Sequence, residues 1–422
     1  MAARLSRPRA AIVASGSELV RGDRNDRNGP FLAASLLRLG IEPARITVVG
    51  DDPAELEQAF HEGLEHDLLV ISGGLGPTHD DRTIELLAKA TGVGLVVDEA
   101  LESQIEATSR RFAERMRRPY ADFAEGVRKQ ATLPAGAVHV GFVGTAPAVV
   151  LDTGSAVAVS LPGPPRELQE LWSRVVETEA LRRVLARATA PERRVLRFYG
   201  LSESALARAL AEAGGDGDGV TVTICAREFE LVADLFVEPG ADTRADELER
   251  GLAAAGAHLV FARDDEPTPA LVLRLARERG LTLATAESCT GGLVASRLTS
   301  VPGSSDVFVG SVVAYANGVK AEALGVPTAV LEEHGAVSAE TAAAMADGAR
   351  QRLAADVAVS ITGVAGPDGG TPEKPVGLVF LHAAGPMGEK AQRIEIPGDR
   401  ETVRTRATVA ALHLVRRLVT QT

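Results

Sequence analysis

Cysteine is nearly absent from this chain of 422 residues, which contains only Cys225 and Cys289. Two thiols outside any Cys-x-x-Cys spacing exclude a disulfide-built scaffold and a zinc ribbon. No run approaches the roughly 18 uncharged apolar residues of a transmembrane helix, and the opening segment lacks the apolar stretch of a secretory signal. We therefore expect a protein of the reducing cytoplasm with no membrane association.

Lysine is also scarce, so that 40 of the 45 basic residues are arginines and the lysines are only Lys89, Lys129, Lys320, Lys374 and Lys390. A buried lysine can lose its proton and act as a base, whereas an arginine stays charged. Where nearly all positive charge is arginine, each retained lysine is a candidate for chemistry that arginine cannot perform. The alternative is that these five positions persist by chance.

Acidic residues outnumber lysine and arginine together, 57 to 45, which gives a net charge of −12. Such a field repels nucleic-acid backbones and anionic lipid, so neither is an expected partner. Small phosphorylated ligands stay compatible, because individual loops hold them locally. The hydrophobic content of 45% excludes a disordered chain, which could not offset the entropy of ordering.

The pattern of apolar segments predicts three regions in an α/β chain. Short apolar strands alternate with helices over residues 9–177, which indicates a parallel sheet with helices on both faces. Residues 178–262 have the pattern of a small α+β module, and the α/β alternation returns after it. We expect two three-layer α/β domains, residues 1–177 and 263–422, joined by this module.

The densest sequence signal is AESCTGG, residues 286–292, which lies between an apolar strand and a helical segment. Ser288 is thus expected on a strand-to-helix turn, where unsatisfied backbone N–H groups at the helix start can stabilise an oxyanion. The two glycines let the backbone approach a substrate closely. A phosphate cradle or an ordinary helix cap would use the same residues, so these alternatives stay open.

A nucleophilic serine needs a base, and no histidine lies close to Ser288 in the sequence. Lys320 follows 320 − 288 = 32 residues later, in the segment YANGVK, about one strand–helix–strand crossover away. Because the carboxyl ends of neighbouring strands meet at one sheet edge, Ser288 and Lys320 are expected to lie close together. The pair predicts a serine nucleophile with a lysine base.

Glycine-rich loops follow the later strands of this region, at ITGVAGP (361–367) and GGTPEKPVG (369–377). Open α/β sheets bind ligands at such loops. Arg400 and Arg404 open the last helix and either hold a phosphate or lie on a solvated face. The candidate ligand-binding residues are Cys289, Thr290, Gly291, Gly292, Asn317, Thr362, Gly363, Gly366, Lys374, Arg400 and Arg404.

Another glycine-rich loop, SGGLGPTHDD (72–81), lies between a strand and a helix of the first region. Its amides can cradle a phosphate, and Asp80 and Asp81 can hold a divalent ion that bridges to it. The alternative is that one of these aspartates only caps the following helix. The candidate nucleotide-binding residues are Glu18, Asn28, Gly73, Gly74, Gly76, Thr78, Gly144, Thr145, Pro162 and Gly163.

Taken in order, the C-terminal motifs resemble the C-terminal domain of the CinA family. They are AESCTGG, PGSS (302–305), the Tyr-x-Asn-x-x-Lys spacing, ITGVAGP, GGTPEKPVG and GDRxxVR (398–404). The resemblance implies a nicotinamide mononucleotide amidohydrolase whose scheme requires no metal or redox cofactor. It implies Ser288 as nucleophile and Lys320 and Tyr315 as base and proton-transfer partners. It also implies that Thr362 and an arginine of 398–404 lie in the substrate pocket.

Residues 9–175 resemble the N-terminal domain of the same family, a MoaB/MogA-like relative of molybdopterin-binding proteins that is associated with ADP-ribose pyrophosphatase activity. The resemblance implies ADP-ribose as a ligand and a divalent metal ion at this site. This chain has GSEL (16–19) and NDRN (25–28) where the family usually has Gly-Thr-Glu-Leu and an Asn/Asp-Thr-Asn triplet. A domain that binds a pterin or nucleotide without turning it over is the alternative.

The middle region resembles the KH-like module that joins the two halves of full-length family members. Its GGDG segment (214–217) fits the loop by which KH domains clamp a nucleic-acid backbone. Asp216 and Asp218, with no basic residue nearby in sequence, predict repulsion. We therefore expect a structural or dimer-forming module and a homodimer. A competence or DNA-damage partner protein, suggested only by the family name, is the remaining alternative.

Overall fold

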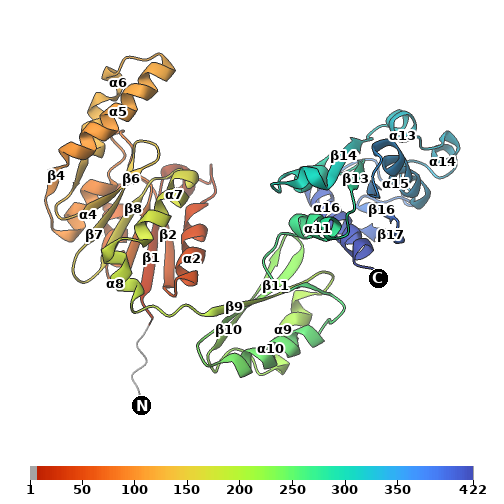
Figure 1. The fold of residues 1–422 in the computed structure, drawn as a ribbon, viewed down its shortest axis with the longest axis horizontal. Helices are drawn as coiled ribbons and strands as arrows, with labels where there is room; N and C mark the ends of the chain where they lie inside the picture. The colour runs from red at the N-terminus through yellow and green to blue at the C-terminus, as the bar shows by residue number, and fades with distance from the viewer. Residues whose placement is uncertain (1–6, 422) are drawn as a thin grey trace. The chain divides into compact units, whose positions relative to one another are not determined.

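The computed structural model describes residues 7–421, apart from the side chain of Asp122, and the chain divides into two compact units between Glu192 and Arg193 (Figure 1). The prediction that the opening segment is no secretory signal falls partly on residues 1–6, which lie outside the described residues. Within residues 7–421, no helix combines the length and the apolar character that a membrane crossing needs.

The first unit is built on a six-stranded mixed sheet. Its strands, in spatial order, are β2 (Glu42–Val49), β1 (Arg9–Ser15), β3 (Leu68–Ser72), β8 (Val157–Leu161), β7 (Pro147–Asp152) and β6 (Val138–Phe142). The first four pair in parallel, whereas β7 and β6 are antiparallel to their neighbours. The prediction of a wholly parallel sheet is therefore wrong at this edge, because the links between these strands are too short for a parallel crossover.

Helices cover both faces of this sheet because its strands are apolar on both sides. In β1, Ala10 and Ile12 face one core, and Ala11 and Val13 face the other. The first core is covered by α2 (Asn28–Arg38), α7 (Pro165–Val176) and α8 (Glu179–Leu185), and the second by α3 (Pro53–Gly63) and α4 (Thr83–Thr91). This confirms the expected α/β fold with three layers.

A helical pair with its own small core extends the first unit (Figure 1). It consists of α5 (Glu99–Met116) and α6 (Ala121–Gln130) beside the two-stranded ribbon of β4 (Leu95–Val97) and β5 (Thr132–Pro134), while the short α1 (Ser17–Val20) follows β1. Leu101 and Ile105 of α5 pack against Val127 of α6. The segment of α6 has too few apolar residues to show a helical period in the sequence.

The middle module opens the second unit and has the antiparallel pair of β10 (Val220–Arg227) and β11 (Glu230–Val237) at one edge of its sheet. The sheet continues in order with β9 (Glu192–Phe198) and β12 (Val260–Ala262), and it shares one core with α9 (Glu203–Glu212) and α10 (Asp242–Ala254). Arg244 of α10 donates to the carbonyl oxygens of Ala213 (2.9 Å) and Gly215 (2.7 Å). Folding therefore brings a basic residue of α10 beside the glycine loop, although none is nearby in the sequence.

The C-terminal domain completes the second unit with another mixed sheet. Its order is β14 (Phe308–Val313), β13 (Leu283–Glu287), β15 (Val357–Gly363), β16 (Leu378–Gly385) and β17 (Gly388–Glu395). The first three strands are parallel, so their carboxyl ends meet at one edge, and β16 and β17 are antiparallel. The sequence did not predict β17, because its polar and charged residues hide the strand pattern.

This second sheet is also covered on both faces. One core is formed with α11 (Thr268–Glu278), α12 (Leu293–Thr299) and α16 (Arg400–Val419), and the other with α13 (Asn317–Leu324) and α15 (Ala339–Leu353). The short α14 (Thr328–Glu333) and a 3₁₀ turn (Ser304–Asp306) lie in the connections. The helices α12 and α13 begin directly after β13 and β14, which places their first residues at the edge where the parallel strands end.

Candidate active site

The turn after β13 presents Ser288 at this edge. The serine N–H donates to the carbonyl of Ile361 in β15 (2.9 Å), so the residue stays attached to the sheet. The chain then turns through Gly291 (φ +61°) and Gly292 (φ +97°) before α12 begins at Leu293. These left-handed angles favour glycine, which explains the glycine pair of the motif.

Lys320 reaches this serine from α13, as its spacing predicted. Its side chain is almost fully buried, and Nζ lies 3.1 Å from Ser288 Oγ. The same nitrogen lies 2.8 Å from the carbonyl oxygen of Ala314 and 3.2 Å from that of Tyr315. A neutral amine has two N–H donors and one lone pair. With both donors on the carbonyl oxygens, the lone pair is free to accept the serine proton.

Burial favours this neutral form of Lys320. Desolvation lowers the pKa of the amine, and the nearby Cys289 sulfur opposes the shift only in part. The three contacts of Nζ are neutral oxygens, so within residues 7–421 no carboxylate hydrogen-bonds to the ammonium form. An arginine at this position could not release its proton, which gives the retained lysine a physical reason.

Cys289, the thiol-bearing residue of the motif, is not an alternative nucleophile. Burial raises the pKa of its thiol to about 12, so the sulfur is protonated near neutral pH. Its backbone carbonyl, and not its side chain, joins the polar network of the turn, because it accepts a hydrogen bond from Arg404 (3.2 Å).

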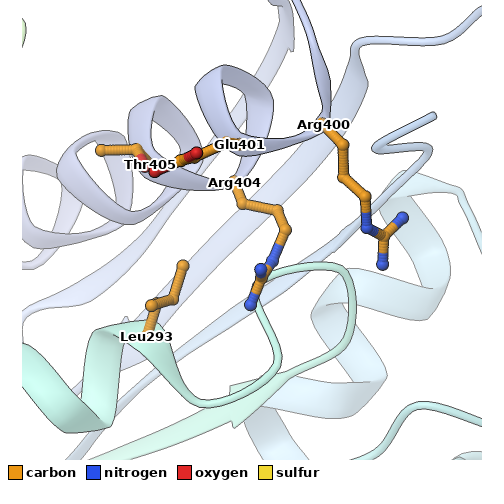
Figure 2. Close-up of a pocket in the computed structure, with 5 residues that line it drawn as sticks. All are labelled: Leu293, Arg400, Glu401, Arg404 and Thr405. Atoms are coloured by element: carbon orange, nitrogen blue, oxygen red, sulfur yellow. The ribbon is translucent and has the colours of Figure 1, made fainter. Parts of the chain in front are cut away.

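Two arginines at the start of α16 line a cavity of about 310 Å³ beside the turn, together with Leu293, Glu401 and Thr405. Figure 2 shows Arg400 and Arg404 projecting from the helix, with Arg404 reaching toward the loop that precedes Leu293. Arg404 Nη2 donates to the Thr290 carbonyl (2.9 Å). Arg404 therefore both holds the serine turn and forms a wall of the cavity.

Tyr315 and Arg400 form the other side of this region. Arg400 donates to the Tyr315 hydroxyl (2.9 Å) and to the carbonyl of Gly366 (2.8 Å). The structure thus places the Tyr315 hydroxyl beside Arg400, while only its carbonyl contacts Lys320. Tyr315 therefore lies beside the base as predicted, but through its backbone carbonyl and not through its hydroxyl. A role for Tyr315 in proton transfer stays a prediction.

Other predicted residues lie farther back in the loops. The Thr362 hydroxyl is buried and donates to the Ala336 carbonyl (2.6 Å), and the Lys374 ammonium donates to the His334 carbonyl (2.7 Å). Both therefore stabilise the loop that contains His334 and Ala336. Asn317 is the exposed first residue of α13, and Gly363 ends β15.

Glu287 is the functional residue that sequence reasoning missed. Its buried carboxylate accepts hydrogen bonds from the N–H groups of Gly292 (3.0 Å), Val294 (3.1 Å) and Ala295 (2.9 Å). The expectation that the helix-start amides face an oxyanion is therefore wrong for these three groups, because a carboxylate already occupies them. The sequence signal that could have indicated Glu287 is its position as a charged residue at the end of an apolar strand.

The N-terminal candidates form a second polar edge. The Asn28 amide donates to Ser72 Oγ (2.8 Å) and to the Gly163 carbonyl (2.7 Å), which ties two of the predicted segments together. Thr83 donates to the Gly73 carbonyl (2.8 Å) and holds the glycine loop. Among the described residues, Asn28 Oδ1 is buried without a hydrogen-bond donor.

The remaining N-terminal candidates border this edge. A cavity of about 250 Å³ follows the loop, and its polar lining includes Gly74, Gly76, Asp81, Lys129 and Gln130. The loop of Gly144 and Thr145 lies beside Glu167, a residue that the sequence analysis did not select. Burial raises the pKa of the Glu167 carboxyl, although the Gly144 N–H partly offsets this shift. Glu18 lies on α1, and Pro162 and Gly163 follow β8.

The donor set at Asp80 and Asp81 is small for a metal site. The Asp81 carboxylate accepts hydrogen bonds from the Thr78 N–H (3.0 Å) and hydroxyl (2.5 Å), whereas Asp80 is exposed. Within the part of the chain that the structure describes, no three His, Cys, Asp or Glu side chains gather into a possible metal site. The residues fit a Mg²⁺-type ion only where ligand phosphates complete its coordination.

Known proteins resemble the chain in both of these regions. Residues 11–183 match the probable molybdopterin binding domain, and residues 265–419 match the CinA C-terminal domain. The CinA-like protein of Mycolicibacterium paratuberculosis is 45% identical over 432 residues, which cover 98% of this chain and 98% of that protein. The chain belongs to the CinA family. This confirms the resemblance that its motifs carry.

A second relative is similar over nearly the whole chain, and a solved structure is similar over part of it. The CinA-like protein of Mycobacterium tuberculosis strain H37Rv is 44% identical over 421 residues, covering 97% of each chain. Among solved structures, the competence/damage inducible protein CihA from Agrobacterium tumefaciens is 41% identical, with a TM-score of 0.33. It covers 35% of this chain and 95% of that chain.

Proposed function

We propose that the C-terminal domain is a nicotinamide-nucleotide amidohydrolase, which converts nicotinamide mononucleotide and water to nicotinate mononucleotide and ammonia. The observation that carries this proposal is the 3.1 Å approach of Lys320 Nζ to Ser288 Oγ. A buried amine without an acidic partner, directed at a serine on a strand-to-helix turn, has the features of a serine–lysine hydrolase.

The reaction proceeds in two halves. Ser288 Oγ attacks the carboxamide carbon while its proton passes to Lys320, which gives a tetrahedral oxyanion. The C–N bond then breaks, Lys320 returns the proton to the leaving nitrogen, and ammonia departs. Water attacks the resulting acyl ester and loses one proton to Lys320, which passes it to Ser288 Oγ as the product leaves as a carboxylic acid, whose remaining proton goes to solvent or to ammonia. One water molecule is consumed, and the side chains return to their starting state.

The arginine-lined cavity supports a phosphorylated substrate. Arg400 and Arg404 place two guanidinium groups beside the serine turn, and guanidinium binds phosphate through paired, charge-assisted hydrogen bonds. The nicotinamide group comes from the family resemblance, and the cavity accounts for the phosphate. Together they favour a mononucleotide over a free amide.

Ammonia release from three amides tests this proposal. We expect kcat/KM to be highest for nicotinamide mononucleotide, lower for nicotinamide riboside, which lacks the phosphate, and lowest for nicotinamide. Ser288→Ala should release no ammonia above background, while Ser296→Ala, an exposed serine on α12, should keep the wild-type rate. Equal rates for wild type and Ser288→Ala would contradict the serine mechanism.

For the N-terminal domain we propose a second activity, cation-assisted hydrolysis of ADP-ribose. The cavity along Gly74 and Gly76 favours it, because Lys129 and the loop amides are suited to a pyrophosphate. Asp80 and Asp81 would hold the ion together with the ligand phosphates, and the ion would neutralise the charge that develops on the leaving group.

Calorimetry separates this activity from simple binding. ADP-ribose and a pterin are titrated with and without Mg²⁺, and the ADP-ribose samples are then analysed for AMP. AMP formation that stops with EDTA, while ammonia release from nicotinamide mononucleotide continues, supports two independent sites. Heat of binding without AMP would instead identify a binding domain.

A further inference from the structure

Glu287 holds a buried negative charge directly before the nucleophile. Its side chain is fully buried, and no lysine, arginine or histidine forms an ion pair with it among the described residues. Oε2 accepts hydrogen bonds from the Thr290 hydroxyl (2.7 Å) and from the N–H groups of Gly292 and Val294. Oε1 accepts from the Ala295 N–H and, at 3.3 Å, from the Thr285 hydroxyl.

These donors replace a cationic partner. A buried carboxylate is costly unless hydrogen bonds satisfy it, and the first N–H groups of a helix supply both donors and a favourable dipole. The Glu287 charge is therefore satisfied by α12 and not by Lys320. Because Glu287 bonds to these groups, it does not pair with Lys320. The amine can therefore stay neutral and act as a base.

The same contacts fix the loop that contains the nucleophile. The segment from Ser288 to Gly292 is held on one side by Glu287, through Thr290 and Gly292, and on the other by Arg404, through the carbonyl oxygens of Cys289 and Thr290. Four charge-assisted hydrogen bonds thus determine the path of five residues. These bonds act on the chain directly after Ser288, whose Oγ lies 3.1 Å from Lys320 Nζ.

We propose that Glu287 is a positioning residue for the amide hydrolysis, whose carboxylate fixes the Ser288–Gly292 turn so that the serine stays aligned with Lys320. The inference deepens the proposed function and rests on it. Glu287 does not contact the reacting atoms, so its effect should appear in the reactivity of Ser288 and not in the binding of the nucleotide phosphate.

Glu287→Gln is the variant that tests this. The side chain keeps its size, but the amide nitrogen cannot accept, so at least two of the five donors lose their acceptor whichever way the amide turns. We expect kcat for nicotinamide mononucleotide to fall about 10- to 100-fold, because small misplacements of reacting groups have effects of that order. KM should change much less than kcat.

Thr285→Val is the matched control. It removes the 3.3 Å hydrogen bond to the same carboxylate, together with the 2.7 Å hydrogen bond to Ser311 Oγ, from the strand side, where Thr285 is equally buried but lies outside the turn. We expect wild-type kcat for this variant at a similar loss of thermal stability. An equal fall in kcat for Thr285→Val and Glu287→Gln, or wild-type kcat for Glu287→Gln, would overturn the inference.

Thr290 provides a second pair of variants if Glu287→Gln does not fold. Thr290→Val removes the 2.7 Å hydrogen bond from the turn to the carboxylate, while Thr290→Ser keeps the donor. The inference requires kcat of Thr290→Val to be lower than that of the wild type and kcat of Thr290→Ser to be close to that of the wild type. Equal rates for the two would contradict it.

A substrate-independent probe separates this inference from the proposed function. The rate at which a fluorophosphonate labels Ser288 reports the alignment of the nucleophile without any nucleotide. Labelling of wild type that slows about tenfold or more in Glu287→Gln supports the positioning role, even if no ammonia is released from nicotinamide mononucleotide. A wild type that labels without hydrolysing this nucleotide contradicts only the proposed substrate. A wild type that does neither overturns both.

Discussion

Lowering the pH should destabilise the second unit through one buried histidine. His413 of α16 is fully buried and stacks on Tyr199 at a ring distance of 3.8 Å. Arg416 Nε lies 3.1 Å from His413 Nδ1 and can only donate, so Nδ1 accepts. The proton of the neutral ring therefore sits on Nε2 and is donated to Glu230 Oε1 of β11 (2.8 Å). This network joins the middle module to the C-terminal domain.

The size of the effect follows from the histidine pKa. Burial lowers the pKa of His413 to about 4 from its usual 6.5, despite the opposing pull of Glu230. Above pH 6.5 neither the folded nor the unfolded histidine is protonated, so the full stability is present. As the pH falls toward 4, the unfolded chain takes up a proton that the folded chain does not. A shift of roughly 2.5 units corresponds to a loss of about 3 kcal/mol.

Neighbouring charges do not reverse this sign. Burial alone would raise the pKa of Glu230, but hydrogen bonds from His413 and Thr268 and the charge of Arg197 lower it overall. The Glu230 contribution is therefore lost only at still lower pH, as the unfolded carboxylate becomes protonated. Between pH 6.5 and 4.5, the histidine is the group expected to set the slope.

Scanning calorimetry between pH 7 and 4.5 measures this slope, and His413→Gln is the comparison because glutamine does not titrate. The single tryptophan, Trp172, lies in the first unit, so its fluorescence tracks that unit separately as an internal control. We expect the second-unit transition of the wild type to fall steeply with pH and that of His413→Gln to be flatter. The same pH dependence in both proteins would refute the reasoning.

Three further substitutions have definite expectations. Arg404→Ala removes two hydrogen bonds to the serine turn and one wall of the cavity, so KM for nicotinamide mononucleotide should rise about tenfold or more and kcat should fall, as steady-state kinetics would show. Phe60→Ala empties a fully buried site and should lower the free energy of unfolding of the first unit by about 3–5 kcal/mol, measured by urea titration. Gly348→Ala would place a methyl group against the Leu324 carbonyl at the end of α13, costing about 1–3 kcal/mol in the second unit by calorimetry.

The sequence could predict the reacting pair because local rules determine it. An apolar strand followed by Ser288 and two glycines indicates a strand-to-helix turn, and one crossover brings Lys320 to the same edge. Both features depend on short segments and on the geometry of parallel strands. The three-layer arrangement was predictable for the same reason, since alternate residues of each strand face different cores.

The contacts around that pair could not be predicted in the same way. Three of the five hydrogen bonds of Glu287 come from N–H groups at the start of α12 and exist only after that helix has formed. A single glutamate in a motif does not indicate which donors it will meet. The antiparallel direction of β7 was missed because hairpin links of a few residues resemble any other loop. Lys374 has the composition of a ligand-binding residue, but the fold of its loop directs its ammonium to the His334 carbonyl.

The central claim is that Lys320 acts as the neutral base of Ser288, and the most direct measurement is kcat for nicotinamide mononucleotide in Lys320→Arg. The arginine side chain stays protonated near neutral pH and therefore cannot accept the serine proton. Thermal unfolding is measured first, to establish that Lys320→Arg and Lys320→Met are folded, and kcat is measured afterwards. The account predicts a fall in kcat of about 10²- to 10⁴-fold in both variants. Wild-type kcat in folded Lys320→Arg would contradict it.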